Sequence, residues 1–231
     1  MKTFLRVLAV AAALLCPSLA LAHGVTSADQ LFIEQSAGSQ LIPFAYLGAK
    51  HMVTGYDHLL FLIGVIFFLF QMREVAVYVT LFSIGHSTTL LFGVLSGTHV
   101  DPFLIDAIIG LSVVYKGLDN LGFFKKRLGF QPNTKGAVLI FGLFHGLGLA
   151  TKLQDFELSS EGLVGNIVAF NVGVELGQLL ALGVVLIGMG FWRRSDGFTR
   201  HAKRVNRMLV AAGLVLTATQ LMGFAGLLGD S

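Results

Sequence analysis

Three potential metal ligands, His51, Asp57 and His58, stand directly before a run of apolar residues that extends to Phe70. Imidazole and carboxylate groups bind divalent transition metals such as nickel, cobalt, zinc and copper. On a straight helix His51 and His58 would share one face, about 10 Å apart along the axis, too far to bind one ion unless the helix bends. We therefore expect two successive sites, an entrance and an interior one.

Further polar groups lie inside other apolar runs. An ionisable side chain in the middle of a bilayer costs about 2.5 to 3.5 kcal/mol when it faces lipid, so Asp57, Lys116 and Glu175 are expected to face the interior of a helix bundle, one another or a bound ion. His86 and His145 lie in neighbouring apolar runs and are expected to converge with Glu175 at the interior site. A single histidine there is more often just hydrogen-bonded across helices, but several together favour a metal site. The polar residues expected to support this interior site are Ser87, Thr88, Asn171 and Gln178.

Small residues accompany these groups. Gly142 with Gly146, and Gly173 with Gly177, form two patterns of small residues four positions apart. Such patterns allow two helices to approach closely, as a buried site between helices requires. Two charges have simpler interpretations: Lys116 is expected to pair with Asp119 on the same helix face, and Asp106 to cap the outer end of its helix.

The composition identifies a membrane protein. The chain is 55% hydrophobic and 13% charged, with a mean hydropathy of +0.78, whereas about 25% of the residues in soluble domains are charged. Its basic residues lie in short loops between apolar runs, so we expect no nucleic-acid partner. The single cysteine, Cys16, lies in the predicted signal segment, so any metal must be bound by nitrogen and oxygen.

Residues 1–22 have the features of a cleaved signal peptide: a basic start, a short apolar core and a small-residue end. Cleavage after Ala22 would make His23 the N-terminus, where amine and imidazole could chelate a metal. The alternative interpretation is that its place is an accident of the cleavage site. Residues 23–50 are expected to form a periplasmic segment and a helix entering the membrane from Pro43. Residues 51–231 would form a six-helix transmembrane domain, with spans at 52–70, 75–96, 103–124, 136–150, 163–191 and 208–228.

The distribution of Lys and Arg predicts the orientation of this all-α bundle. The loops after spans one, three and five hold most of the basic residues, whereas the other side holds only Lys50 and Lys152. Basic loops stay in the cytoplasm, so both mature termini are expected in the periplasm of a bacterial inner membrane. The basic residues expected inside are Arg73, Lys125, Lys126, Arg127, Lys135, Arg193, Arg194, Arg200, Lys203, Arg204 and Arg207.

Several motifs together resemble the HupE/UreJ family. They are His51-x5-Asp57-His58, Gly85-His86-Ser87-Thr88-Thr89-Leu90, Phe144-His145-Gly146 and Phe170-Asn171-x-Gly173-Val-Glu175. The resemblance implies a small bacterial membrane permease with a cleaved signal, associated with nickel supply to hydrogenase or urease. It also implies maturation partners for such enzymes. The branch is divergent, because Leu149, Ala150 and Lys152 stand where better-studied members have histidine, glycine and glutamate.

A second class of protein has a similar residue set. Intramembrane zinc hydrolases of the ceramidase and adiponectin-receptor type would use His58, His86 and His145 as ligands, with Asp57 or Glu175 as general base. Their paired-histidine segment is missing from this sequence, and a transporter needs no base. Transport of a divalent metal, with nickel as the first choice, is the preferred interpretation. A homo-oligomer is compatible with the sequence, which gives no oligomeric state.

Overall fold

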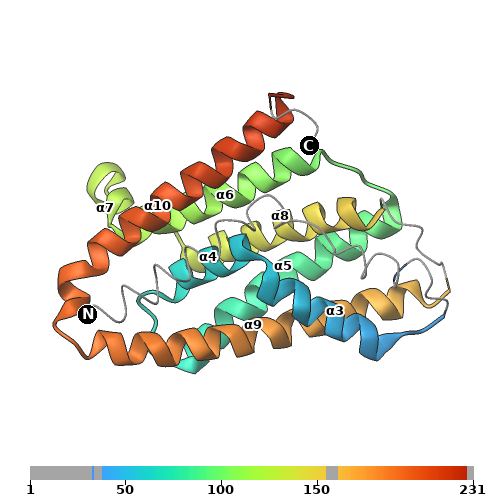
Figure 1. Ribbon diagram of the computed structural model, residues 1–231, viewed down its shortest axis with the longest axis horizontal. Coiled ribbons are helices and arrows are strands. Elements are labelled where there is room, and N and C mark those ends of the chain that lie inside the picture. The colour runs from blue at the N-terminus through green and yellow to red at the C-terminus, as the bar shows by residue number, and fades with distance from the viewer. Residues whose placement is uncertain (1–32, 34–37, 155–160, 228–231) are drawn as a thin grey trace.

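The apolar segments of the chain form helices that run roughly along one long axis (Figure 1). The computed structural model describes residues 33, 38–154 and 161–227, apart from the side chains of Tyr56 and Asp57. None of the described residues forms a strand, so the predicted all-α fold class is confirmed. The helices are α3 (Leu41–Thr54), α4 (Tyr56–Ile66), α5 (Met72–Ser96), α6 (Pro102–Asn120), α7 (Phe123–Leu128), α8 (Thr134–Gln154), α9 (Leu163–Arg193) and α10 (Gly197–Phe224).

Four of these helices, α5, α8, α9 and α10, are long and apolar enough to cross a membrane. Every fourth or third residue along one face of α9 is an apolar side chain at least half exposed, as expected of a surface that faces lipid. These residues are Val164, Val168, Val172, Leu176, Leu180, Val184, Ile187 and Phe191. The protein is therefore a helical membrane bundle, and the predicted count of six spans remains a prediction, because α6 contains three ionisable residues and α3 and α4 are short.

The predicted first span is not one helix. Its chain breaks at Gly55, whose ψ of 95° lies outside the helical range, so that α3 ends at Thr54 and α4 starts at Tyr56. The Gly55 N–H still donates to the His51 carbonyl (2.9 Å), and the Gly55 carbonyl accepts from the Leu59 N–H (3.1 Å). Glycine is a poor helix former, which lowers the cost of a break at this position. The two short helices point in different directions (Figure 1).

Three pairs of helices pack closely: α5 with α8, α6 with α10, and α3 with α9. A methyl group on Gly146 of α8 would collide with the His86 carbonyl of α5, and one on Gly173 of α9 would collide with the Ala45 carbonyl of α3. A methyl group on Gly177 would lie 2.9 Å from Ala49. The predicted close approach at both small-residue patterns is therefore confirmed. Contact at this distance is possible only because glycine has no side chain.

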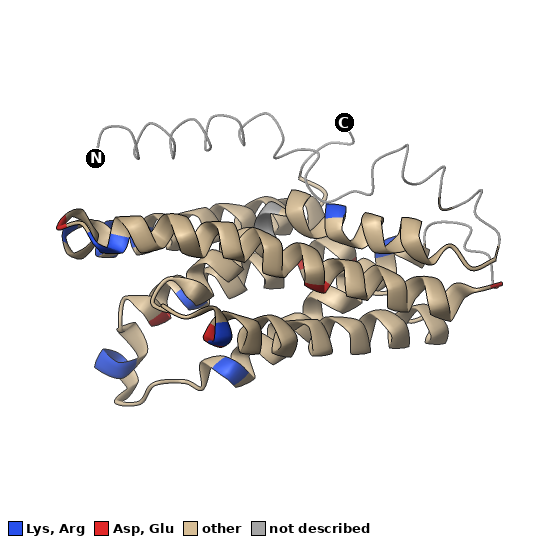
Figure 2. Ribbon diagram, turned by 90° about the horizontal axis from the view of Figure 1, so that it is seen from below, with Lys and Arg blue, Asp and Glu red and all other residues tan. Residues whose placement is uncertain are grey.

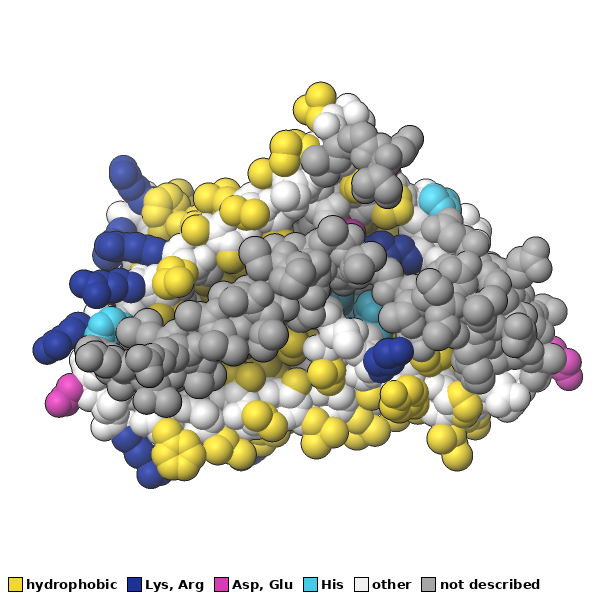
Figure 3. Space-filling view, viewed as in Figure 1, with side chains coloured by type: hydrophobic (Ala, Val, Ile, Leu, Met, Phe, Trp, Pro, Cys, Tyr) yellow, Lys and Arg dark blue, Asp and Glu magenta, His cyan; other side chains and the backbone are white. Residues whose placement is uncertain are grey.

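Basic side chains gather at one end of the bundle. Figure 2 shows few charged residues along the middle of the helices, and Figure 3 shows most Lys and Arg side chains at the left-hand end. This end, here called the basic end, contains α7, the end of α9 and the start of α10, including Arg193 and Arg194. The Arg193 guanidinium donates to the carbonyls of Ile66 and Phe67, both at 2.7 Å, and so caps the C-terminus of α4.

Candidate metal site between helices α3, α4, α5 and α8

Three imidazole rings from three helices follow one another through the bundle. The ring centroids of His51 (α3) and His58 (α4) lie 5.4 Å apart, and those of His58 and His145 (α8) lie 4.5 Å apart. The separation of about 10 Å expected for a straight helix does not apply, because the helix bends at Gly55, the alternative that the sequence left open. The entrance and interior positions expected from the sequence therefore form one continuous series.

His86 is held by a partner on another helix. Its Nδ1 lies 3.1 Å from Oδ1 of Asn171 on α9, and the Asn171 amide nitrogen donates to the Ile167 carbonyl (3.0 Å). The second bond fixes the amide so that its oxygen faces the imidazole, and Nδ1–H of His86 must then donate. Asn171, expected from the sequence among the supporting polar residues, thus fixes the His86 ring. The Nε2 of His86 is buried and has no hydrogen-bond partner among the described residues.

His145 is oriented in the same way by its own helix. Its Nδ1 lies 2.6 Å from the Phe141 carbonyl, so it donates and leaves the lone pair of the neutral ring on Nε2. Metal-binding histidines commonly have this arrangement, in which one ring nitrogen is fixed by an acceptor and the other is a ligand. Both rings are almost completely buried, His86 at 0% and His145 at 2% exposure.

Phenylalanine rings surround the histidines. The Phe82 ring stacks on His86 (6.0 Å between centroids) and also contacts His58 and His145 at 6.1 and 4.9 Å. Phe61, on the side of His58 toward the end of α4, contacts Phe82 and His145. These aromatic side chains, which the sequence pattern did not single out, exclude water from the imidazoles. A low-dielectric surrounding strengthens any bond between the rings and a cation.

Several predicted site residues lie elsewhere. The half-buried Glu175 carboxylate accepts a hydrogen bond from the exposed Thr80 of α5 (3.3 Å) and makes none with the described histidines. Thr88 is exposed, and its hydroxyl donates to the Ile84 carbonyl of its own helix (2.7 Å). Its neighbour Thr89, which was not predicted, donates instead across to the Leu143 carbonyl of α8 (2.6 Å). Helix rotation relative to its neighbours, which the sequence does not fix, decides between the two threonines.

Other predicted site residues cannot be placed in this way. Ser87, expected as a supporting residue, is half-buried and makes no side-chain hydrogen bond with the residues that the structure describes. His23, the signal segment 1–22 and the side chain of Asp57 lie outside the described residues, although Asp57 itself is the second residue of α4. Among the side chains that the structure describes, no group of three or more His, Cys, Asp or Glu residues could together hold a metal ion.

Two further polar side chains on α5 and α9 are buried. Gln178 is completely buried, and neither atom of its amide group has a hydrogen-bond partner among the described residues. The Ser83 hydroxyl, 6% exposed, likewise has none there. Buried polar groups without partners are uncommon in native proteins and call for a water molecule, an ion or a functional role. Gln178, predicted as a supporting residue, is therefore a potential oxygen donor.

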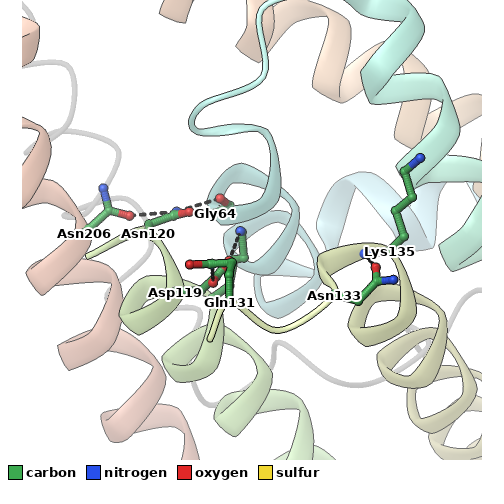
Figure 4. A network of polar contacts seen from close by, with 8 residues as sticks. Gly64, Asp119, Asn120, Gln131, Asn133, Lys135 and Asn206 are labelled. Carbon is green, nitrogen blue, oxygen red and sulfur yellow. Dashed lines mark hydrogen bonds and ion pairs between the residues drawn. The ribbon is translucent and has the colours of Figure 1, made fainter. Parts of the chain in front are cut away.

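A second polar network lies toward the basic end (Figure 4). The Lys116 ammonium pairs with the Asp119 carboxylate at 2.5 Å, as predicted, and Gln131 donates to the other Asp119 oxygen. Asn120 donates to the Gly64 carbonyl (2.8 Å) and to Asn206 (2.9 Å). A cavity of about 260 Å³ adjoins these groups, and its other lining residues are Val65, Phe68, Leu69, Tyr78 and Thr134.

The prediction for Asp106 is wrong. Asp101 caps α6, because its carboxylate accepts from the Leu104 N–H (3.2 Å). Asp106 lies one turn further on and pairs with Lys152 of α8 at 2.9 Å. Distance along the sequence favoured a local role for Asp106, whereas the packing of α6 against α8 supplies a cation from another helix.

The chain belongs to the HupE/UreJ family. The family model described as HupE / UreJ protein matches residues 27–227, which include every helix named above. This is a membrane family of the nickel and cobalt transporter type, so the chain is a multi-pass membrane protein associated with transition metals. No curated protein and no solved structure matches it. The resemblance inferred from the histidine motifs is confirmed.

Proposed function

We propose that this protein is a permease for a divalent transition metal, with nickel as its first substrate and cobalt, zinc and copper as further candidates. The observation that carries the proposal is the series of imidazoles His51, His58 and His145, with neighbouring rings 5.4 and 4.5 Å apart across three helices. Neutral imidazoles bind these metals well. Rings placed in succession allow a cation to pass from one ligand to the next.

The broken helix supports the same function. Discontinuous helices mark substrate sites in many transporters, because the carbonyl end of a half-helix carries partial negative charge and attracts a cation. Here the C-terminal turn of α3 ends next to His51, and Asp57 stands in the first turn of α4. In the proposed site Asp57 balances the charge of the arriving cation, and the Gln178 amide oxygen is an additional donor.

The orientation follows from the basic end. We place this end in the cytoplasm of a bacterial inner membrane, with residues 1–22 as a cleaved signal and both mature termini in the periplasm. A cysteine introduced at Thr98, beyond α5, should react with an impermeant thiol reagent in intact cells. A cysteine at Asn133, just before α8, should react only after the cells are opened. The reverse pattern would refute the orientation.

Metal binding by the purified protein tests the site itself. Ni²⁺ bound at equilibrium would be measured by dialysis and elemental analysis for the wild type and for His58→Ala and His145→Ala. Each substitution should weaken binding at least about tenfold, since even residues that only orient a ligand contribute that much. The double variant should lose little more than either single one, because the two rings act as a unit.

His201→Ala is the matched control. His201 lies near the start of α10, at the basic end, where its Nδ1 donates to the Gly197 carbonyl (2.8 Å). This variant removes an imidazole without touching the histidine series, and it should bind Ni²⁺ like the wild type. Equal binding by His58→Ala and His201→Ala would refute the proposed site.

A further inference from the structure

Two short patterns occur twice in the chain. Gly48 and His51 in α3 have the same spacing as Gly142 and His145 in α8. Phe82 and Gly85 in α5 likewise have the same spacing as Phe170 and Gly173 in α9. Short patterns of this kind arise by chance, so their meaning depends on whether the residues also pack in equivalent ways.

The glycines of the first pattern pack on the phenylalanines of the second. A methyl group on Gly48 would collide with the Phe170 carbonyl, and one on Gly142 would collide with the Phe82 carbonyl. The contact between α3 and α9 is thus the same as the contact between α8 and α5. If α3 is exchanged with α8, and α9 with α5, the contact between Gly48 and Phe170 becomes the contact between Gly142 and Phe82.

The contacts of Gly173 and Gly85, the glycines of the second pattern, are also equivalent when α3 is exchanged with α8 and α9 with α5. A methyl group on Gly173 would collide with the Ala45 carbonyl, and one on Gly85 would collide with the Leu139 carbonyl. Ala45 and Leu139 each lie three residues before the glycine of the first pattern. Two matched pairs of contacts, one pair at each helix crossing, therefore relate α3 to α8 and α5 to α9.

The remaining pair of helices, α6 and α10, contact each other, and exchanging the two helices leaves this contact unchanged. A methyl group on Gly110 would lie 2.8 Å from the Thr217 backbone nitrogen, and one on Gly213 would lie 2.8 Å from that of Val114. Val114 follows Gly110 at the same spacing at which Thr217 follows Gly213. Each helix thus contacts the other through a glycine and the residue four positions after it.

The contacts at the two ends of the α6–α10 pair are also equivalent under this exchange. Asn120 of α6 bonds to Asn206 of α10 at one end (2.9 Å), and Gly223 of α10 packs on the Phe103 ring of α6 at the other. Under the spacing that relates Gly110 to Gly213, Phe103 corresponds to Asn206 and Asn120 to Gly223. The exchange therefore holds from Phe103 to Asn120 in α6 and from Asn206 to Gly223 in α10.

We propose that the chain is an inverted repeat, in which the half α3 to α6 and the half α8 to α10 are related by a two-fold axis in the membrane plane, and that the halves exchange conformations during transport. Opposite entry directions of two three-span halves produce this symmetry, which many transporters use for alternating access. His51 and His145 are then equivalent residues of the two halves, whereas the residue equivalent to His58 is Lys152.

The halves differ in one helix. The first half is broken at Gly55, whereas the equivalent position in the second half is Leu149, within the continuous helix α8. Gly148 stands beside it, and a glycine inside a helix weakens the helix at that point. In the alternate state α8 breaks at Gly148, and α3 and α4 join into one helix.

The two ends of the bundle also differ, as the two halves do, in the surroundings of the equivalent residues Tyr78 and Asn166. Tyr78 lines the cavity of about 260 Å³ at the basic end. Its equivalent Asn166, at the opposite end, is buried and bonds to the Gly38 carbonyl (3.0 Å) and the Gln40 N–H (2.7 Å). The structure therefore has a cavity beside Tyr78 and none of that kind among the described residues beside Asn166, and in the proposed exchange the cavity closes beside Tyr78 and opens beside Asn166.

Gly55→Ala tests the exchange through the accessibility of single cysteines. Gly55 has a negative φ, which alanine adopts without strain, while alanine favours a continuous helix over the break. Cysteine at Ile167, buried near the end opposite the basic end, should react with a thiol reagent about fivefold faster in this background, and cysteine at Tyr78 correspondingly slower. Gly148→Ala strengthens continuous α8, although its methyl group, 2.7 Å from the Ile105 side chain, requires that side chain to shift, and it should change both rates in the opposite direction.

Gly188→Ala is the control, because Gly188 is an exposed helical glycine with no neighbour within 4 Å of an added methyl group. It should change neither rate. If Gly55→Ala and Gly148→Ala also leave both rates unchanged, the exchange is refuted. The role of the exchange in metal transport rests on the proposed function, but the cysteine labelling measures the exchange itself and needs no metal. A shift in labelling without metal transport would refute the proposed function alone, and transport without a shift would refute the exchange alone.

Discussion

The histidine series and the Lys116–Asp119 network are both polar regions in an apolar bundle, but their charges are balanced differently. Lys116 and Asp119 neutralise each other at 2.5 Å within one helix. Beside the histidine series, His86 donates Nδ1–H to the Asn171 oxygen, and within the series His145 donates Nδ1–H to the Phe141 carbonyl. The Lys116–Asp119 network pairs its own charges, whereas in the function proposed above the histidine series binds a cation. Substitutions should therefore affect stability in the first region and metal binding in the second.

The largest effect is expected from Lys116→Met. It leaves the Asp119 carboxylate buried without its cation, and breaking a buried ion pair in this way costs about 3 to 5 kcal/mol. Thermal unfolding in detergent would measure the loss. The double variant Lys116→Met/Asp119→Leu removes both charges and should recover most of the stability. If the double variant is as unstable as the single one, the pair does not balance itself, and the contrast with the histidines fails.

Asn171→Ala should have an intermediate effect on metal binding. Without its Oδ1, the His86 ring loses the acceptor that fixes Nδ1–H, and partners of this kind contribute roughly 10- to 100-fold in metal affinity. Equilibrium dialysis with Ni²⁺ measures the change. Asn171→Asp retains an acceptor oxygen and should restore most of the affinity. Wild-type binding by Asn171→Ala would show that His86 needs no support from α9.

The smallest effect is expected from Thr89→Val. This change removes the bond from Thr89 to the Leu143 carbonyl, and hydrogen bonds between membrane helices contribute about 0.6 kcal/mol on average. Thr88→Val is the matched control, because Thr88 is exposed and bonds only to its own helix. Thermal unfolding should separate the two variants. An equal or larger loss for Thr88→Val would contradict the orientation of α5.

The sequence predicted much of the fold because membrane helices have a strong local signal. The apolar runs located the helices, and the glycine patterns around Gly146 and Gly173 indicated which faces pack closely. Helix ends were less predictable. The fourth segment, expected at 136–150, forms the longer α8, and the third ends at Asn120 before Gly122, whose φ of +70° favours glycine.

The site was predictable in composition but not in geometry. His58 and His145 were identified from the sequence, but their ring contact depends on the break at Gly55, for which a glycine gives only a weak local signal. Glu175 was expected to join the histidines, yet it faces Thr80, because the rotation of α9 against α5 is set by packing over the whole helix. Contacts between distant segments require the structure.

Uptake by proteoliposomes tests the central claim most directly. Purified protein would be reconstituted with Ni²⁺ outside and none inside, so that no energy source is needed, and the metal inside measured over time. The wild type and His201→Ala should accumulate Ni²⁺ well above empty liposomes, whereas His58→Ala should match the empty liposomes. Wild-type protein that binds Ni²⁺ but admits no more of it than empty liposomes would contradict the account.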